Sequence, residues 1–182
     1  MIFSPTAIPE VILISPRTFQ DQRGDFLETY RYDHFSRNGI AGQFVQDNHA
    51  GSKLGVLRGL HYQIQNPQGK LIRVISGEIY DVAVDLRKSS PSFGQHIGLR
   101  LDDQKKEMLW IPAGFAHGYY VLSKWAEVSY KVTDYYAPAF ERTLIWNDPA
   151  LNIPWPLLGE DHPILSENDL QGMGFKETDL YE

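Results

Sequence analysis

Short runs in which apolar residues alternate with polar ones recur along most of the chain, separated by turn-forming residues. Strand-like runs spaced about 8 to 12 residues apart are typical of a β-sandwich or barrel. The runs that predict strands are residues 11–15, 25–30, 44–50, 54–63, 70–76, 78–86, 96–102, 106–112, 117–123, 126–134 and 143–148. Residues 32–39 predict one short helix that Gly39 ends, and residues 166–172 predict a turn. The pattern therefore predicts a mainly β fold with a few short helices.

The clearest predicted hairpin covers residues 70–87, with a tight turn at residues 76–77. In its second strand the apolar residues of 80–86 alternate with Asp81 and Asp85, so that one face is apolar and the other acidic. The ordinary interpretation is that an acidic face points to solvent, and we expect this for Asp85.

Residues 148–163 are rich in proline and tryptophan and predict irregular chain that wraps the barrel before a mixed tail. The sequence contains no internal repeat, low-complexity tract or linker. A chain of 182 residues has the size of one ordinary domain. We therefore expect residues 1–182 to form a single domain with an irregular C-terminal tail.

Charge and composition narrow the classes of function. Lys and Arg total 17 against 23 Asp and Glu, a net charge of −6, so no general attraction to nucleic acid or to an anionic membrane is expected. An anionic ligand needs a local cluster of basic side chains. The absence of cysteine suits a reducing compartment, and the sequence offers neither a signal peptide nor an apolar run of about 20 residues. We expect a soluble cytoplasmic protein with no membrane or nucleic-acid partner.

The stretch GVLRGLHYQ, residues 55–63, combines two basic side chains with a strand pattern. Strict alternation places Arg58 and His61 on opposite faces of that strand. A cavity, a bend at one of the glycines or a partner charge would make both tolerable. The stretch alone leaves open whether His61 is bonded inside the core with Arg58 in solvent, or whether both serve a site.

A second histidine, His117, ends a Pro-x-Gly-x-x-His stretch like that of metal-binding cupins. Those barrels also use a His-x-His pair, but here Gln63 stands two positions after His61. Two imidazoles are too few ligands for a tight site, so a metal-dependent oxygenase or lyase is only an alternative and no metal ligand is assigned. A neutral imidazole in a pocket also suits proton transfer near neutral pH. Asp169 is one acceptor that could orient it, although Ser166 and Asp169 locally favour a helix N-cap.

Seven stretches together resemble the dTDP-4-dehydrorhamnose 3,5-epimerase family. They are DQRGDFLETY, FVQDNHA, GVLRGLHYQ, PQGKLIRVISGEIYDVAVDLRKSSPSFG, WIPAGFAHGYYVLS, YKVTDYYAPAFE and IWNDPALNIPWP. The similarity runs from about Pro9 to Asp169 in the order of the family. It implies a cupin-like jelly roll, a homodimer, a dTDP-sugar substrate, and catalysis without a metal or organic cofactor.

The resemblance also implies the roles of individual residues. The family's base falls on His61, its orienting aspartate on Asp169, its acid on Tyr130, and a lysine that stabilises an enolate on Lys70. Its substrate-binding residues fall on Phe19, Arg23, Glu28, Gln46, Asn48, Arg58, His117 and Tyr136. The N-terminal segment is expected to pair with a partner subunit, so that Arg23 and Glu28 act in the neighbour's site.

Each of these positions also has an ordinary structural interpretation. Tyr130 shares a strand face with valines and Phe19 suits a core, while Glu28 suits a strand-face charge and Gln46 and Asn48 suit a turn. The same pocket would also serve a 3- or 5-monoepimerase, a ketoisomerase or a non-catalytic binding module for nucleotide sugars.

Overall fold

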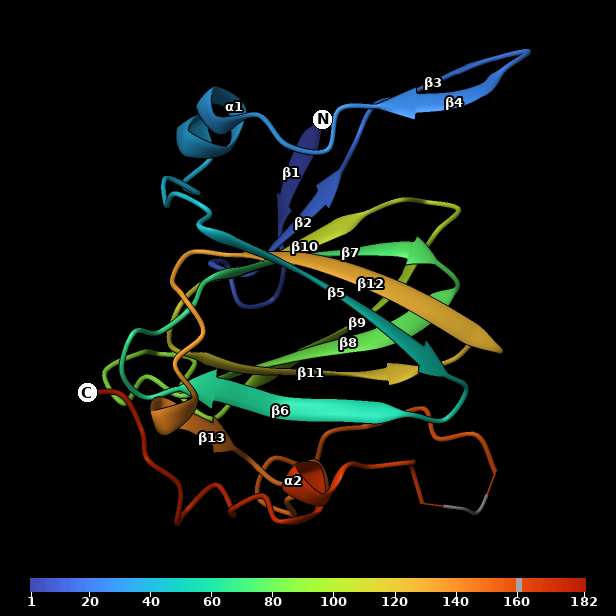
Figure 1. The fold of residues 1–182 in the computed structure, drawn as a ribbon. Coiled ribbons are helices and arrows are strands. Elements are labelled where there is room, and N and C mark those ends of the chain that lie inside the picture. Colours follow the sequence, from blue (N-terminus) through green and yellow to red (C-terminus); the bar gives the residue numbers. More distant parts are fainter. Residues whose placement is uncertain (160–161) are drawn as a thin grey trace.

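Two antiparallel β-sheets face each other in the computed structural model, which describes residues 1–159 and 162–182 (Figure 1). The six-stranded sheet has the order β1 (Ile2–Pro5), β2 (Ile12–Ser15), β10 (Met108–Ile111), β7 (Lys70–Ser76), β12 (Trp125–Val132) and β5 (Gln46–Lys53). The five-stranded sheet has the order β13 (Glu141–Thr143), β6 (Leu57–Gln63), β11 (Phe115–Val121), β8 (Glu78–Asp85) and β9 (His96–Asp102). The remaining elements are β3 (Thr18–Asp21), β4 (Gly24–Leu27), α1 (Tyr32–Arg37), the 3₁₀ turn η1 (Pro138–Phe140) and α2 (Glu167–Leu170). The predicted jelly roll, mainly β with a few short helices, is confirmed.

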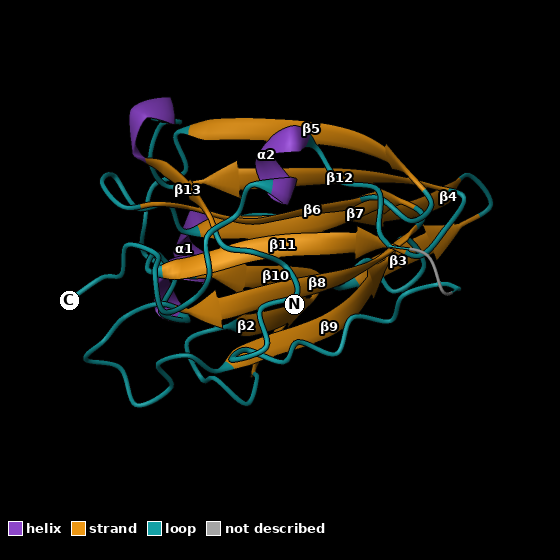
Figure 2. Cartoon of the chain, turned by 90° about the horizontal axis from the view of Figure 1, so that it is seen from below, coloured by secondary structure: helices purple, strands orange, loops and turns teal. Residues whose placement is uncertain are grey.

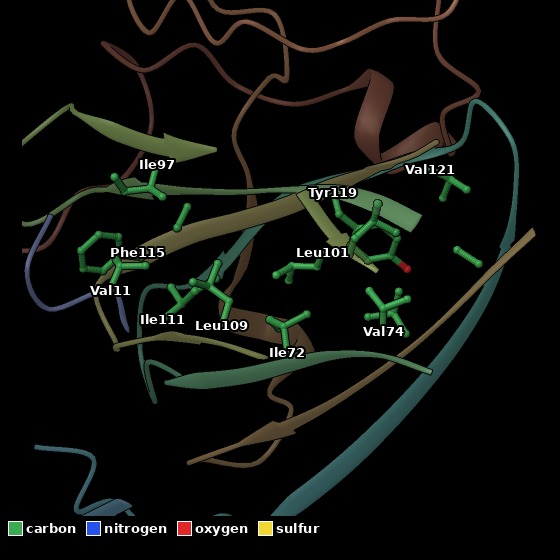
Figure 3. Packing of buried hydrophobic residues seen from close by; sticks show 14 of the residues in the cluster. Val11, Ile72, Val74, Ile97, Leu101, Leu109, Ile111, Phe115, Tyr119 and Val121 are labelled. Carbon is green, nitrogen blue, oxygen red and sulfur yellow. The ribbon is translucent and has the colours of Figure 1, made fainter. Parts of the chain in front are cut away.

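The core lies between the two sheets and is built from alternate residues of their strands (Figure 3). Buried side chains from both sheets meet there, among them Ile72, Val74, Leu109, Ile111, Ile97, Leu101, Phe115, Tyr119 and Val121. Burial of each large apolar side chain stabilises the fold by roughly 1.5–3 kcal/mol. Because side chains alternate along a strand, the burial of Ile72 and Val128 also turns Lys70 and Tyr130 toward the interior.

The predicted hairpin of residues 70–87 is wrong in its pairing. β7 pairs with β10 and β12, whereas β8 pairs with β11 and β9, so the two consecutive strands belong to different sheets. Gly77 turns the chain between them with φ +84°, and a Cβ there would lie 2.2 Å from the Trp125 carbonyl oxygen. A tight turn between two alternating runs has the same sequence pattern whether the strands pair or cross to facing sheets.

The expectation that Asp85 points to solvent is also wrong, because Asp85 is fully buried. The C-terminal segment covers the outer face of the five-stranded sheet, as Figure 2 shows from below, and packs against the apolar residues of β8, so the acidic face of β8 points toward the core between the sheets. Burial opposes ionisation of Asp85, but hydrogen bonds from Arg87, Ser90 and Ser92 outweigh it and lower its pKa to about 2. Residues 148–159 and 162–163 form the predicted irregular chain, while residues 160–161 lie outside the described part.

The N-terminal region departs most from its sequence pattern. The strands at residues 2–5 and 18–21 have no counterpart among the predicted strands. Toward the other end of the chain, the strand predicted at residues 143–148 is largely wrong, because β13 covers Glu141–Thr143 and shares only Thr143 with it. The β3–β4 hairpin projects away from the two sheets (Figure 1). The predicted helix is confirmed as α1, and Gly39 follows it with φ +85°. None of the described helices is long and apolar enough to cross a membrane.

Candidate active site

A cleft of about 320 Å³ opens between the two sheets. Its lining comprises Gln46, Asn48, His61, Tyr62, Gln63, Gln68, Lys70, Tyr130, Tyr136 and Glu141. The lining therefore includes the predicted base, acid and lysine together with three of the predicted substrate-binding residues. His61 comes from the five-stranded sheet and Tyr130 from the six-stranded sheet, so the two side chains reach the cleft from facing walls.

His61 is joined to a carboxylate that lies 108 positions later in the chain. The distance between His61 Nε2 and Asp169 Oδ1 is 2.6 Å, and Asp169 is almost fully buried on α2. Because a carboxylate accepts hydrogen bonds, this contact places the imidazole proton on Nε2 and leaves the lone pair on Nδ1. That arrangement suits a histidine that removes a proton.

Asp169 also forms the helix cap that its local sequence favours. Its backbone N–H donates to Ser166 Oγ, and its Oδ2 accepts from Ser166 Oγ at 2.7 Å and from the Ser166 backbone at 3.4 Å. Its Oδ1 accepts from His61 and from the Gly59 backbone at 3.2 Å. Burial opposes ionisation, but these hydrogen bonds prevail and lower the pKa of Asp169. Asp169 therefore serves both as part of the helix cap, through Oδ2, and as the acceptor for His61, through Oδ1.

Strand β6 does not keep the strict alternation that its sequence suggests. Its register against β11 shifts, since His61 lies opposite His117 while Arg58 lies opposite Tyr119. Residues 117 and 119 share a face of β11, so Arg58 and His61 also share a face. The predicted opposite faces are therefore wrong. The irregularity falls at Gly59, which has φ +119° and where a Cβ would lie 2.5 Å from a backbone atom of β11.

Lys70 lies beside His61 at the start of β7. Its Nζ donates to the His61 carbonyl oxygen at 3.3 Å, and the side chain is almost fully buried. Burial lowers the pKa of Lys70 to about 8, although the nearby carboxylates of Asp81 and Glu141 oppose this shift. The ammonium group is thus a poorly hydrated positive charge, which suits stabilisation of an oxyanion.

Tyr130 and Tyr136 contribute two phenols to the opposite wall. Burial raises the pKa of Tyr130; the charge of Arg58 lowers this pKa and the charge of Glu141 raises it. The phenol therefore keeps its proton at neutral pH. Tyr136 is half exposed, and its hydroxyl donates to Glu141 Oε2 at 2.8 Å. The two side chains present a proton donor and an open aromatic face within one cleft.

His117 forms a second histidine–aspartate pair, which does not line the cleft. Its Nε2 lies 2.9 Å from Asp81 Oδ2, and both residues are buried. Burial lowers the pKa of His117, although Asp81 opposes the shift. The predicted contact of His117 with substrate thus has no direct counterpart in the lining of the cleft.

The structure does not bring Phe19, Arg23 and Glu28 into this cleft. Phe19 and Arg23 line a separate hollow on the projecting β3–β4 hairpin, where Arg23 forms an ion pair with Asp21 and is largely exposed. The Glu28 carboxylate forms an ion pair with Arg31 instead, with 3.8 Å between Glu28 Oε2 and Arg31 Nη1. The N-terminal group of predicted residues is therefore remote from His61 within one chain.

Arg58 lies on the same face of β6 as His61 but outside the lining of the cleft. Its Nε donates to Ser52 Oγ at 2.9 Å. Its positive charge reaches Tyr130 nonetheless, because it lowers the pKa of that phenol against the larger effect of burial. Arg58 is thus held at the margin of the cleft by β5.

Sequence reasoning assigned no function to Tyr62, Gln63, Gln68 and Glu141, although all four line the cleft. The period of two places Gln63 on the face of His61, which was a usable signal. Glu141 carries no such signal, because it belongs to a three-residue strand at the sheet edge. Within residues 1–159 and 162–182, no group of three or more His, Asp or Glu side chains is placed to hold a metal ion.

Known proteins match nearly the whole chain. The family model for dTDP-4-dehydrorhamnose 3,5-epimerase matches residues 5–177. A curated dTDP-4-dehydrorhamnose 3,5-epimerase from Pseudomonas aeruginosa is 56% identical over 176 residues, which cover 96% of each chain.

Solved structures also match nearly the whole chain. A dTDP-6-deoxy-D-glucose-3,5-epimerase from Legionella pneumophila, in complex with dTDP-4-keto-L-rhamnose, superposes with a TM-score of 0.95 at 46% identity, covering 99% of this chain and 97% of that one. A 3′-monoepimerase from Streptomyces bikiniensis, in complex with dTDP-quinovose, gives 0.86 at 31% identity over 94% and 87% of the two chains. With the family model and the curated relative, these matches show that the chain belongs to the dTDP-4-dehydrorhamnose 3,5-epimerase family of isomerases.

Proposed function

We propose that the chain converts dTDP-4-dehydro-6-deoxy-D-glucose to dTDP-4-dehydro-L-rhamnose with His61 as the base and Tyr130 as the acid. In this substrate the C4 ketone acidifies the C–H bonds at C3 and C5, because the anion formed at either carbon delocalises onto the ketone oxygen. One base can therefore serve both centres. The observation that carries the proposal is that His61, held by Asp169, and Tyr130 reach one cleft from facing sheets.

Each inversion needs a proton to leave one face of the sugar and another to arrive on the opposite face. His61 Nδ1 takes the proton from carbon, the C–H electron pair forms a double bond to C4, and the carbonyl π pair moves onto the C4 oxygen to give an enolate. The C4 carbonyl then re-forms as the carbon takes a proton on its other face from the Tyr130 hydroxyl. The acid and the base then return to their starting states by exchange with solvent. A positioned acid or base is typically worth about 10² to 10⁴ in rate.

The enolate oxygen needs a positive partner, and Lys70 is the buried cation that lines the cleft. Preorganised charge beside a developing oxyanion acts strongly where water is excluded. The Coulombic effects of Asp81 and Glu141 favour the charged form of Lys70 at neutral pH. Lys70 thus serves both centres, since the same ketone oxygen receives the charge in each half-reaction.

Recognition of the nucleotide falls to the other end of the cleft. The half-exposed ring of Tyr136 is suited to stacking on thymine, with Gln46 and Asn48 as polar neighbours. Arg58 supplies a guanidinium fork for the pyrophosphate in a protein whose net charge is −6.

Proton exchange tests the reaction directly. When substrate is turned over in deuterated water, NMR should show deuterium entering at both C3 and C5. Incorporation at neither carbon would contradict proton abstraction. Tyr130→Phe should keep exchange but sharply slow complete inversion, because the proton is still removed and no acid returns it to the opposite face. Near-normal turnover of that variant would exclude Tyr130 as the acid.

A single epimerisation is the second candidate, because the chain also superposes well on a 3′-monoepimerase. Label at C3 alone, with no label at C5 after prolonged incubation, would favour it. The double reaction has the stronger support, since the relatives of higher identity carry the 3,5-epimerase name.

The working unit is proposed to be a cytoplasmic homodimer in which the β3–β4 hairpin completes the neighbour's cleft. Its support is the remote position of Phe19 and Arg23, both on a hairpin that projects from the sheets (Figure 1). Two inactive chains, one carrying Arg23→Ala and the other His61→Leu, should regain activity after refolding together, because one site of the mixed dimer is then intact. An active monomer in sedimentation experiments would refute this arrangement.

A further inference from the structure

The side chain of Gln63 makes contacts that the proposed reaction does not use. Gln63 is almost fully buried on β6, two residues after His61 and on the same face. Its Oε1 accepts from the Ala137 backbone at 2.8 Å, and its Nε2 donates to the carbonyl oxygens of Asn66 at 2.8 Å and Tyr135 at 3.3 Å. One amide therefore holds the residues immediately before and after Tyr136.

The segment that carries Tyr136 is held by side chains instead of a strand ladder. Three successive backbone N–H groups, those of residues 135, 136 and 137, donate to the side chains of Asp134, Gln46 and Gln63. The carbonyl oxygen of Asp134 accepts from Gln68 Nε2 at 2.8 Å. The position of the Tyr136 ring thus depends on glutamine side chains from β5, β6 and the loop before β7.

We propose that Gln63 is a positioning residue for nucleotide binding, which fixes Tyr136 for the base by holding both peptide groups that flank it. The inference rests on the proposed function, in which Tyr136 stacks on thymine. It assigns to the β6 strand a second task besides carrying His61. The strand relates the imidazole to the nucleotide-binding ring, because His61 and Gln63 lie two residues apart on it and the Gln63 amide holds the peptide groups that flank Tyr136.

The contacts fix the orientation of the amide, since its two donors face carbonyls and its acceptor faces an N–H group. A carboxylate at this position would keep the contact with Ala137 but would direct an oxygen at the two carbonyl oxygens. Gln63→Glu should therefore weaken nucleotide binding at least as much as Gln63→Met, which keeps the volume and removes all three hydrogen bonds.

A double-mutant cycle on the dissociation constant of dTDP, measured by calorimetry, tests the inference. Gln63→Met should weaken binding about tenfold, as expected for the loss of hydrogen bonds on both sides of the ring. In a Tyr136→Ala background the same change should have less than a twofold effect, because the ring that Gln63 positions is absent. KM should rise more than kcat falls, since the base and the acid are untouched. Gln95→Met, at an exposed glutamine that does not line the cleft, is the matched control and should change neither.

The outcomes separate the inference from the function on which it rests. If Tyr136→Ala weakens binding but the effects of the two changes simply add, Gln63 does not act through Tyr136 and the inference is overturned. If Tyr136→Ala leaves dTDP affinity unchanged, the nucleotide contact of Tyr136 is wrong and the role of Gln63 falls with it, whereas deuterium exchange still tests the epimerase reaction. Melting temperatures of all variants show whether a loss of fold accounts for any change, and Gln63→Glu supplies a second variant should Gln63→Met fail to fold.

Discussion

The histidines of two histidine–aspartate pairs lie on the neighbouring strands β6 and β11, and the surroundings of the two pairs differ sharply. The His61 side chain is 33% exposed and opens into the cleft, whereas the His117 side chain is only 8% exposed. Asp169 receives hydrogen bonds from Ser166 and Gly59 in addition to His61. Asp81 Oδ1 has no partner among the described residues, and its Oδ2 contacts His117.

The comparison shows that two features decide what such a pair can do. They are the hydrogen bonds that the carboxylate receives from other groups and the exposure of the imidazole to solvent. Solvent reaches the His61 ring, and Asp169 keeps hydrogen-bond donors other than His61. The His117 pair is sealed in low dielectric, where any change in charge is costly. The first pair suits proton transfer, and the second suits a fixed polar contact behind the cleft.

Matched leucine substitutions of the two histidines give the largest expected effect. His61→Leu should reduce deuterium incorporation at C3 and C5 about 10³-fold, equivalent to about 4 kcal/mol in the barrier. The cause is the loss of the only group proposed to take the carbon-bound proton. The rate of label entry, followed by NMR, measures the effect. A loss below tenfold would assign the base to another residue.

His117→Leu should instead lower the free energy of unfolding by about 3 kcal/mol, because it leaves the buried Asp81 carboxylate without its partner. Urea denaturation of both leucine variants measures this difference. His61→Leu should cost less, since Asp169 keeps its contacts with Ser166 and Gly59. Equal destabilisation by the two substitutions would remove the distinction between the pairs.

Asp169→Asn tests the orienting contact with a smaller expected effect. The amide oxygen can still accept from His61 Nε2, but the charge that stabilises a protonated imidazole is lost. We expect kcat to fall about 10²-fold, or about 2.7 kcal/mol, with little change in KM. Steady-state kinetics measures the split. A rise in KM alone would indicate that Asp169 supports the shape of the cleft and not the proton transfer.

The sequence predicted the strands around the exposed His61–Asp169 pair better than the long-range contact that forms this pair. Alternation and glycine signals located β6, β7, β8 and α1, since each depends on local side-chain pattern. The contact between His61 and Asp169 spans 108 positions. The local pattern offered Asp169 as one of many acceptors and favoured it as a helix cap, and the family resemblance selected it. Long-range contacts of this kind depend on how the sheets close, which a local pattern does not contain.

The strand that carries Asp81 of the sealed pair was predicted wrongly for a related reason. Asp85 of β8 was expected to be solvated, yet Asp85 and Asp81 are both fully buried. One face of β8 is covered by the opposite sheet and the other by the C-terminal segment, so both faces of the strand are internal. A strand buried on both faces accepts an acidic residue where a specific partner lies nearby, here His117 for Asp81 and Arg87 for Asp85.

Lys70 connects the two pairs, and the pH dependence of the rate provides the most sensitive comparison. Its Nζ donates to the His61 carbonyl oxygen, and its pKa of about 8 results from burial opposed by the charge of Asp81 and then Glu141. In the proposed reaction the protonated form of Lys70 stabilises the enolate, so kcat/KM should fall as the pH rises above about 8, by up to about tenfold per unit. Asp81→Asn removes a charge that raises the pKa of Lys70, and should therefore move this alkaline limb to lower pH. Glu127→Gln, at an exposed carboxylate on the outer face of β12, should leave the limb in place. If Asp81→Asn does not move the alkaline limb, the charge of Asp81 in the buried His117 pair has no influence on Lys70 beside His61.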